Sequence, residues 1–576
     1  MLSPSAVLSP RVSAAITDAF GADFRGEDPV LRPSQFADVQ VNAALALSKR
    51  VGLPPRDVAA KIVEHLDVSD VCETVEVSGP GFVNLRLSQA WISDQLTAMA
   101  ADPRLGVPLQ DVQRIPIDYS APNVAKEMHV GHLRTTVVGD ALARTLEHLG
   151  HHVIRQNHIG DWGTPFGMLI EHLLDVGEAS NHARLVETDP NAFYQAARAK
   201  FDADEQFTAR SRGRVVALQA GDPDTLRLWR ELVELSKHYF NKIYARLGVT
   251  LTDADLAGES RYNDRLAAVC DELEAAGLAT MSDGALCVFL DGYTGRDGQP
   301  VPLIIRKSDG GYGYATTDLA TIKYRVEELK ADRIIYVIGA PQALHLNMVW
   351  DTARNAGWLP ATVTPIHVQI GNVLGADRKI LRTRSGKPLR LTALLDEAEA
   401  KARAVIDKAR PDLDIKTRAA IAPQVAVGAV KYADLSVAHD SDYVFDLERM
   451  VALQGNTGPY LQYAAARIRS IFRTANLQVE QANNPIQAAD PAERELGLVL
   501  LEFGTVVAQV GDDLEPHRLC GHLFQLAQVF SNFYEKCPVL KADPATRTSR
   551  LALCALTLRV LVQELELLGI EAPDRM

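Results

Sequence analysis

The chain of 576 residues contains little cysteine and no long apolar run. Its cysteines form no C-x-x-C pair, so the sequence indicates neither a zinc ribbon nor a disulfide framework; they are Cys72, Cys270, Cys287, Cys520, Cys537 and Cys554. No uncharged apolar stretch reaches about eighteen residues, the length that indicates a membrane span. The N-terminal residues also lack the charged segment and apolar core of a secretory signal. These absences favour a cytoplasmic protein with no membrane partner.

Basic residues are not in excess. Lys and Arg total 60 against 73 Asp and Glu, which gives a formal net charge of −13. This balance argues weakly against a nucleic-acid partner, although a protein that grips RNA on one side can combine an acidic total with basic patches. The chain is too long for one core and, at about 150 residues per domain, suggests three or four structural units.

The pattern of helices and strands divides the chain into three predicted domains. Residues 1–110 form a small α+β region, residues 111–440 alternate strands with helices as a doubly wound parallel sheet does, and residues 441–576 predict an all-α helical bundle. In the first domain we expect helices at Phe36–Val51 and Arg56–Leu66, strands at Cys72–Val77 and Phe82–Leu87, and a turn at Ser78–Gly81.

The central domain has four strand candidates, Arg114–Asp118, His152–Gln156, Ile334–Ile338 and Pro365–Ile370, interrupted by helical insertions at Ala192–Ala203 and Pro223–Leu247. The bundle has helix candidates at Gly458–Ala475, Ala492–Val510, His517–Glu535 and Pro544–Leu568, with a polar loop at Asn476–Asp490. Open α/β sheets bind ligands at the carboxyl ends of their strands, so we expect the functional residues there.

A histidine pair stands where the first central strand gives way to a long helix. The segment Asp118-Tyr-Ser-Ala-Pro-Asn-Val-Ala-Lys-Glu-Met-His-Val-Gly-His132 follows that strand, and apolar residues then recur at helical spacing up to Gly150. We expect His129 and His132 on the first helical turn, where free backbone N–H groups and the helix dipole can hold the phosphates of ATP. A His-x-Gly-His string alone is weak, because such a pair is often only a solvated helix face.

Two further segments allow an ordinary and a functional interpretation. Asp318 can cap the helix that follows it, or it can join Asp118 and Tyr314 to bind a guanidinium, which needs carboxylates and a flat aromatic wall. The run Asp377-Arg-Lys-Ile-Leu-Arg-Thr-Arg-Ser-Gly-Lys387 packs many cations together, and such a run is ordinarily a solvated charged surface. It is no Walker A loop, because the required glycine spacing and the Ser or Thr after the lysine are absent.

The string from Ser120 to Arg134 resembles the signature region of class I aminoacyl-tRNA synthetases, and within that class it is similar to arginyl-tRNA synthetases. The likeness continues in order along nearly the whole chain, through Gly160-Asp-Trp-Gly163, Gln342-Ala-Leu-His345, Arg382-Thr-Arg-Ser-Gly386, Val427–Leu435, Gly455–Tyr463 and Phe530–Tyr534. It implies a class I Rossmann-like catalytic domain at 111–440, a tRNA-contacting domain at 1–110 and a helical anticodon-binding domain at 441–576.

The resemblance also implies the residues of an ATP site. In the family the histidines stabilise charge on ATP while an amino-acid carboxylate attacks the α-phosphorus. We therefore expect ATP to be bound by His129, Gly131, His132, His345 and Lys387. The catalytic residues expected are His129, His132, Lys126, Lys379, Arg382 and Arg384, with Mg²⁺ arriving with ATP and no metal bound by the protein itself.

Positions that match the family's arginine pocket are Asp118, Asn123, Tyr314, Asp318 and Gln342. Two departures are visible, since Pro165 stands where the family usually has Gln and Gly339 where it commonly has Asp. The Gly160–Gly163 segment is either a simple turn or, by resemblance, lies beside the α-amino group or the tRNA 3′ end.

Recognition of tRNA(Arg) is expected from Tyr460, Tyr463 and Arg467, because single-stranded bases stack on Tyr and Arg. The resemblance further implies a monomer that must bind tRNA before it forms arginyl-adenylate from ATP and L-arginine. Two alternatives remain at this point. A small-molecule nucleotidylyltransferase also uses a His-x-Gly-His turn but usually lacks so long a helical domain, and a synthetase-like regulatory RNA-binding protein would no longer catalyse.

Overall fold

The computed structural model describes residues 3–32, 34, 36–124, 126–178, 180, 185, 189–295, 298–382 and 389–576. It forms two compact units. The central unit comprises Gln110–Val451 and Leu567–Ile570, and the terminal unit comprises Met1–Leu109, Ala452–Glu566 and Glu571–Met576. Each unit is described separately below.

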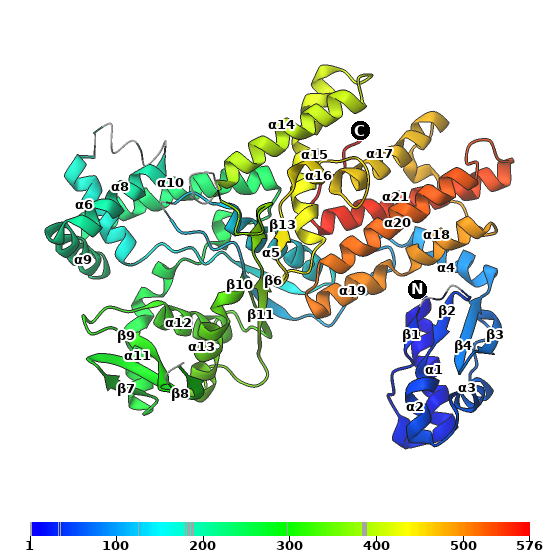
Figure 1. The fold of residues 1–576 in the computed structure, drawn as a ribbon, viewed down its shortest axis with the longest axis horizontal. Coiled ribbons are helices and arrows are strands. Elements are labelled where there is room, and N and C mark those ends of the chain that lie inside the picture. The colour runs from blue at the N-terminus through cyan, green and yellow to red at the C-terminus, as the bar shows by residue number, and fades with distance from the viewer. Residues whose placement is uncertain are drawn as a thin grey trace. The chain divides into compact units, whose positions relative to one another are not determined.

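A parallel four-stranded sheet organises the central unit (Figure 1). Its strands are β5 (Arg114–Asp118), β6 (His152–Gln156), β10 (Arg333–Gly339) and β11 (Thr364–Ile370), in the order β11-β10-β5-β6. The predicted β5 and β6 are confirmed to the residue, β11 begins one residue before its predicted start, and β10 is one residue longer than predicted at each end. Ile115, Ile117, Ile334, Ile335 and Val337 are all fully buried, which explains why these short apolar runs become inner strands.

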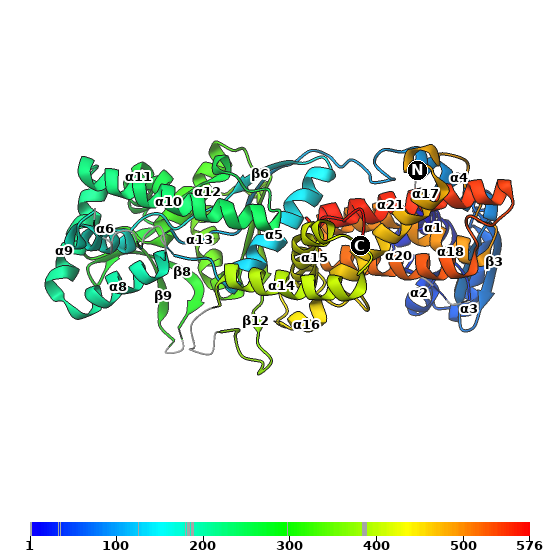
Figure 2. The same cartoon turned by 90° about the horizontal axis from the view of Figure 1, so that it is seen from above.

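Helices surround this sheet and extend from it: α5 (Val130–His148), α6 (Thr164–Val176), α8 (Pro190–Ala203), α9 (Glu205–Gln219), α10 (Pro223–Leu247), α11 (Asn263–Ala275), α12 (Tyr314–Glu327), α13 (Ala343–Asn355), α14 (Leu391–Ala409), α15 (Ile415–Leu435) and α16 (Leu447–Met450). The insertion helices α6, α8, α9 and α10 gather at one end of the unit in both Figure 1 and Figure 2. Helix α10 has the predicted bounds, because Asp222 caps its start and Gly248 ends it in a left-handed conformation.

A second sheet in the central unit escaped sequence analysis. Strands β7 (Ala279–Ser282), β8 (Ala285–Thr294) and β9 (Pro300–Arg306) form an antiparallel sheet that packs with α11, α12 and α13 on a shared core. The short strands β12 (Val373–Leu374) and β13 (Tyr443–Val444) pair in parallel elsewhere in the unit.

The N-terminal part of the terminal unit contains α1 (Pro4–Phe20), β1 (Leu31–Arg32), β2 (Val39–Val41), α2 (Ala43–Val51), α3 (Pro55–Glu64), β3 (Cys72–Ser78), β4 (Phe82–Leu87) and α4 (Gln89–Ala101). Its antiparallel sheet has the order β1-β2-β4-β3. The predicted helix Phe36–Val51 is wrong in its first half, because Val39 and Val41 pair with β4 and the helix begins only at Ala43. Helix α1 was not predicted.

The helical part of the terminal unit contains α17 (Gly458–Ala475), α18 (Pro491–Leu501), α19 (Phe503–Asp513), α20 (His517–Lys536) and α21 (Pro544–Leu567). The single helix predicted for Ala492–Val510 is broken at Glu502. Gly504 follows the break and lies so close to the backbone of Gly106 that a Cβ would come within 2.3 Å of that carbonyl oxygen.

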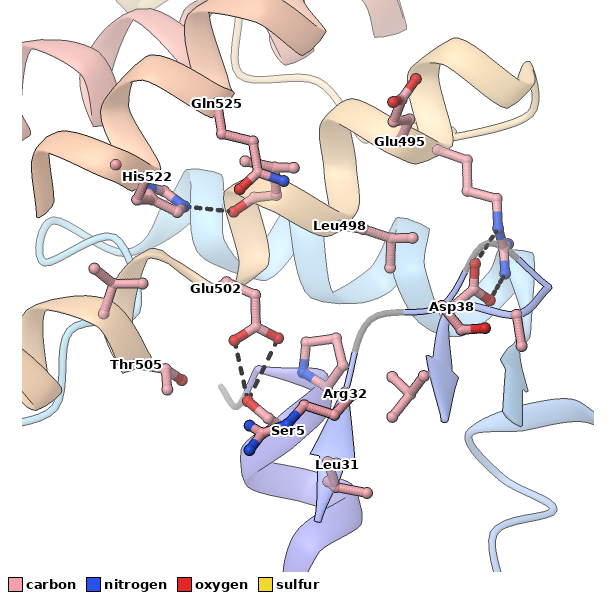
Figure 3. A pocket seen from close by; sticks show the side chains of 18 of the residues that line it. Ser5, Leu31, Arg32, Asp38, Glu495, Leu498, Glu502, Thr505, His522 and Gln525 are labelled. Carbon is pink, nitrogen blue, oxygen red and sulfur yellow. Dashed lines mark hydrogen bonds and ion pairs between the residues drawn. The ribbon is translucent and has the colours of Figure 1, made fainter. Parts of the chain in front are cut away.

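A cavity of about 820 Å³ lies inside the terminal unit, between α1, β1 and β2 on one side and α18 to α20 on the other (Figure 3). Glu502 projects into it and accepts a hydrogen bond from Ser5 Oγ at 3.0 Å, while Arg494 pairs with Asp38 at its edge. His522 also lines the cavity, and its Nδ1 shares a hydrogen bond of 2.5 Å with Glu564 within the bundle. Across the described ranges, no helix is long and apolar enough to cross a membrane.

Candidate active site

The chain turns sharply as it leaves strand β5. Ser120 and Ala121 have φ values of 71° and 45°, a left-handed conformation that side chains other than glycine seldom adopt. The Ala121 N–H donates to Asn157 Oδ1 at 3.1 Å, and Tyr244 hydroxyl hydrogen-bonds both Ser120 Oγ and Asn157 Nδ2, at 2.8 and 3.0 Å. A strained backbone held by buried polar partners is typical of functional sites.

This turn is bound to the segment that follows strand β6. Asn123 and Gly160 form a backbone bridge, with Val124 N–H donating to the Gly160 carbonyl at 3.1 Å. Gly160 packs closely against the Asn123 side chain, since a Cβ at this position would lie 2.6 Å from Asn123 Oδ1 and would displace that amide. The two signature segments recognised in the sequence therefore form one continuous edge of the site.

The histidine pair begins helix α5. His129 is its N-cap residue, and its Nδ1 accepts the Gly131 N–H at 3.0 Å. His132, the third helical residue, accepts the His129 N–H on its own Nδ1 at 3.1 Å. The ring centroids lie 4.1 Å apart. Since Nδ1 is the acceptor in both rings, each neutral imidazole carries its proton on Nε2 and can donate from that atom.

Burial keeps both imidazoles neutral. It lowers the pKa of His132 to about 3, with the neighbouring His129 and Lys126 adding to the effect. Burial first, and then Lys126, also lower the pKa of His129. The pair therefore presents two neutral N–H donors at the positive end of the α5 dipole, an arrangement suited to phosphate oxygens. The backbone N–H groups that we expected to be free here are already bonded, because Val130 N–H donates to the Leu389 carbonyl, Gly131 N–H to His129 Nδ1 and His132 N–H to the His129 carbonyl.

The residues that follow the basic run, 389–391, lie against the histidine pair. Val130 N–H donates to the Leu389 carbonyl and Leu391 N–H to the Met128 carbonyl, both at 3.0 Å. Between them Arg390 pairs with Glu127 at 2.7 Å. Of the predicted cations in the run, Arg384 and Lys387 lie outside the described residues, whereas Lys379 and Arg382 are exposed. Lys126 places its Nζ 4.3 Å from the ring centroid of Tyr194 on α8.

The turn after β5 also borders a cavity of about 790 Å³ at the carboxyl ends of the strands, which Ala121 helps to line. Its lining contains every predicted arginine-binding residue, namely Asp118, Asn123, Tyr314, Asp318 and Gln342, and also His345, His158 and Glu259. Separate segments of the chain therefore converge on one pocket. Asp318 lies within α12 rather than at its N-cap, so the ordinary interpretation of Asp318 as a helix cap is wrong.

The predicted aspartates differ in their surroundings. Asp118 is 6% exposed and its Oδ2 accepts a hydrogen bond from Arg325 Nη2 at 2.6 Å, so an internal cation already balances its charge. Asp318 is more open and binds His345 Nε2 at 2.6 Å. This hydrogen bond raises the pKa of His345, whose side chain lines the same cavity.

Glu259 is a pocket residue that sequence analysis missed. It stands in a 3₁₀ turn, Glu259–Tyr262, and burial raises its pKa to about 8, with Asp161 and Asp318 contributing through their charges. Asp161, from the Gly160–Gly163 segment, accepts the Ser260 N–H at 2.9 Å and Ser260 Oγ at 2.6 Å. That segment therefore orients the turn that carries Glu259. No motif around Glu259 marks it in the sequence.

The two residues that depart from the family pattern, Pro165 and Gly339, both fit their local backbone. Pro165 occupies the first turn of α6, where a missing backbone N–H costs nothing. Gly339 ends strand β10, and a Cβ there would have only Pro341 Cδ nearby, at 3.6 Å, so its surroundings are open.

The predicted tRNA-binding residues lie on α17 in the terminal unit. Tyr460 packs edge-on to Phe524 at 6.0 Å between ring centroids, and Tyr463 is 37% exposed. Arg467 lies over the ring of Tyr534 at 4.4 Å. Aromatic and guanidinium groups are thus accessible along one helix.

Comparison with known proteins agrees with this geometry. Three family descriptions match in order: the Arginyl tRNA synthetase N terminal domain over residues 6–87, tRNA synthetases class I (R), catalytic domain, over 95–447, and the DALR anticodon binding domain over 461–576. An arginine–tRNA ligase of Thermobifida fusca is 70% identical over 577 residues, covering 100% of both chains. One of Frankia casuarinae is 53% identical and covers 98% of this chain and 97% of its own.

Among solved structures, an arginyl-tRNA synthetase from Plasmodium falciparum superposes with a TM-score of 0.84 at 28% identity, covering 100% of both chains. One from Thermus thermophilus has the same fold, with a TM-score of 0.80 at 24% identity over 99% of this chain and all of its own. The chain belongs to the arginyl-tRNA synthetases, a family of class I aminoacyl-tRNA synthetases.

Proposed function

We propose how this chain carries out the family reaction, the ATP-dependent attachment of L-arginine to tRNA(Arg). The observation that supports the proposal most is the convergence of the predicted arginine residues on one cavity at the strand ends, lined in part by the segment that leads from β5 to the histidine pair. The first step is an in-line displacement at the α-phosphorus, so it needs positioning and charge stabilisation rather than a protein nucleophile.

The guanidinium of arginine is assigned to the carboxylates of Glu259 and Asp318, with Tyr314 as the flat wall. Both carboxylates line the cavity and lie close enough for the charge on Asp318 to raise the pKa of Glu259. A planar fork of donors satisfies two carboxylates, which a lysine ammonium cannot do equally well. Asp118, Asn123 and Gln342 are assigned to the rest of the substrate, since Asp118 is already paired with Arg325.

ATP is assigned to the N-terminus of α5. His129 and His132 donate from Nε2 to phosphate oxygens, and the exposed Gly131 lets the nucleotide approach the backbone. His345, Lys126 and the basic run with Lys379, Arg382, Arg384 and Lys387 complete the proposed ATP and catalytic sets. These cations would stabilise the charge that develops on the departing pyrophosphate.

Mg²⁺ is assigned to the phosphate oxygens of ATP. In the part of the chain that the structure describes, no three His, Cys, Asp or Glu side chains converge as a metal site requires. The ion would lend positive charge to the phosphates when bound.

The terminal unit is assigned to tRNA, through residues 1–110 at the outer corner and through Tyr460, Tyr463 and Arg467 at the anticodon. The proposed domains are 1–110, 111–440 and 441–576, in a monomer that works in the cytoplasm and activates arginine only once tRNA is bound.

The test is esterification of tRNA(Arg) by the purified chain with ATP and each of the twenty amino acids in turn. Charging should occur with arginine and should require both ATP and tRNA. Charging with another amino acid while arginine is inert would contradict the substrate assignment, and no charging at all would favour a non-catalytic protein.

A further inference from the structure

Arg134, two residues after His132 on α5, is buried and holds a segment far along the chain. Its Nε donates to Asp434 Oδ1 at 3.0 Å, and the two side chains are 1% and 0% exposed. Its Nη1 donates to the Ser441 carbonyl at 2.7 Å, and its guanidinium lies 5.2 Å from the ring centroid of Tyr443. The Arg134 side chain of α5 therefore binds residues 437–444, here termed the clamp loop.

The opposite side of the clamp loop binds the base of the basic run. Tyr443 and Val444 form strand β13, which pairs with Val373 and Leu374 of β12. Just before β12, Gly371 N–H donates to the His439 carbonyl at 2.8 Å. A Cβ on Gly371 would lie 2.7 Å from the Ser441 carbonyl oxygen, so the two backbones pack in direct contact.

A second tie at this base uses side chains on the surface. Asn372 donates to Asp442 Oδ1 twice, from its backbone N–H at 2.6 Å and from Nδ2 at 3.1 Å. Both residues are exposed, so this tie can be cut without leaving a charge buried.

Strand β12 in turn fixes the cations that follow it. Leu381 N–H donates to the Val373 carbonyl at 2.9 Å, and Gly375 N–H donates to the Lys379 carbonyl at 2.8 Å. Residues 373–381 thus form a tight hairpin with Lys379 on its returning strand, here termed the basic hairpin. A continuous chain of contacts leads from α5 through the clamp loop to Lys379.

We propose that Arg134 and the clamp loop are positioning residues for adenylate formation, because they fix the basic hairpin relative to the histidine pair. The proposal rests on the proposed role of the hairpin cations at the phosphates. Arginine suits the task because its planar fork satisfies a carboxylate and a backbone carbonyl together, which a lysine does not. Packing alone does not call for a buried ion pair, since apolar residues of similar volume often stabilise a fold at least as well.

Asp442→Ala is the main test. Asp440→Ala is its matched control, because the Asp440 side chain is an exposed carboxylate of the same loop that accepts from Ser441 Oγ at 3.4 Å and takes no part in the tie to Asn372. With tRNA present, Asp442→Ala should lower kcat for ATP–pyrophosphate exchange about ten- to a hundredfold, since a misplacement of about 1 Å can cost a hundredfold. The Kd for arginine and the Tm should stay as in the parent. Arg134→Lys should act in the same direction, with Arg144→Lys on the same helix as its control.

A double-mutant cycle separates positioning from general loosening. Asp442→Ala should cost much less in a Lys379→Ala background than in the parent, because the cation that it positions is then absent. If Lys379→Ala alone leaves exchange unchanged, the role of Lys379 at the phosphates is wrong, and the proposal falls with it. Two outcomes would contradict the positioning role of the clamp loop while leaving the proposed function intact. In one, Lys379→Ala slows exchange but Asp442→Ala does not; in the other, the two effects simply add.

Discussion

At the scale of single residues, the protonation of the histidine pair determines its chemistry. Both imidazoles use Nδ1 to accept a backbone N–H, and burial lowers both pKa values, so each offers a neutral Nε2–H. A neutral donor does not bind the ground-state phosphates as a full charge would. It can still strengthen its hydrogen bond as negative charge develops in the transition state.

His132→Ala is therefore expected to slow adenylate formation about a hundredfold or more, the usual loss for one preorganised donor, while the arginine Kd changes little. Single-turnover adenylate formation and calorimetric arginine binding measure the two effects. His172→Ala, a histidine on α6 that packs against Phe193, is the control for loss of an imidazole. An unchanged rate in His132→Ala would remove His132 from the catalytic set.

Glu259 predicts a pH dependence of arginine binding. Its pKa is raised to about 8, so below that pH the carboxyl is mostly protonated and neutral, and above it the carboxylate is ready to pair with a guanidinium. Arginine affinity should therefore rise as pH increases from about 6 to 8, and binding in that range should release a proton.

Calorimetry in buffers of different ionisation enthalpy measures that proton directly. Glu259→Gln should abolish the pH slope, while Glu274→Gln, an exposed carboxylate on α11, should preserve it. A slope that persists in Glu259→Gln would mean that another group titrates.

At the scale of elements, the sequence predicted those parts that local pattern determines. The strands β5 and β6 and the helices α10 and α17 have the predicted bounds, because buried runs and caps such as Asp222 and Thr457 mark them. It also placed Asp118, Tyr314 and Asp318 at the ligand side of the sheet. Tyr314 and Asp318 are one helical turn apart on α12, and Arg325 follows seven residues later on the same face, so one helix supplies three groups of the pocket region.

What escaped prediction depends on contacts between distant segments. The break between α18 and α19 coincides with the approach of Gly504 to Gly106, and strand β2 replaces a helical pattern because β4 pairs with it. Glu259 was missed for the same reason, since Asp161 holds its turn and Asp318 lies across the pocket. The pairing of Asp118 with Arg325 likewise spans more than two hundred positions.

Tyr460 on α17 is predicted to stack on a base of tRNA. Tyr460→Ala should weaken tRNA(Arg) binding by about 1–3 kcal/mol if a base stacks on the ring, with arginine and ATP affinities unchanged. Tyr460→Phe, which keeps the ring and its packing on Phe524, should bind tRNA as the parent does. Filter binding with a Tm measurement checks both, and native affinity in a well-folded Tyr460→Ala would exclude the stacking role.

At the scale of the whole molecule, the chain forms two compact units, with the arginine pocket and the histidine pair in one and the proposed anticodon residues in the other. The family resemblance implies that activation of arginine waits for tRNA. We accordingly expect ATP–pyrophosphate exchange with arginine to be negligible until tRNA(Arg) is added. Appreciable exchange without tRNA would show that the central unit is competent by itself.

The central claim is that one cavity holds the guanidinium of arginine while the neighbouring histidine helix holds ATP. A crystal structure with L-arginine and a non-hydrolysable ATP analogue tests it most directly. The guanidinium should lie between Glu259 and Asp318, with phosphate oxygens at hydrogen-bonding distance from Nε2 of His129 and His132. A guanidinium bound outside this cavity, or phosphates far from both imidazoles, would contradict the account.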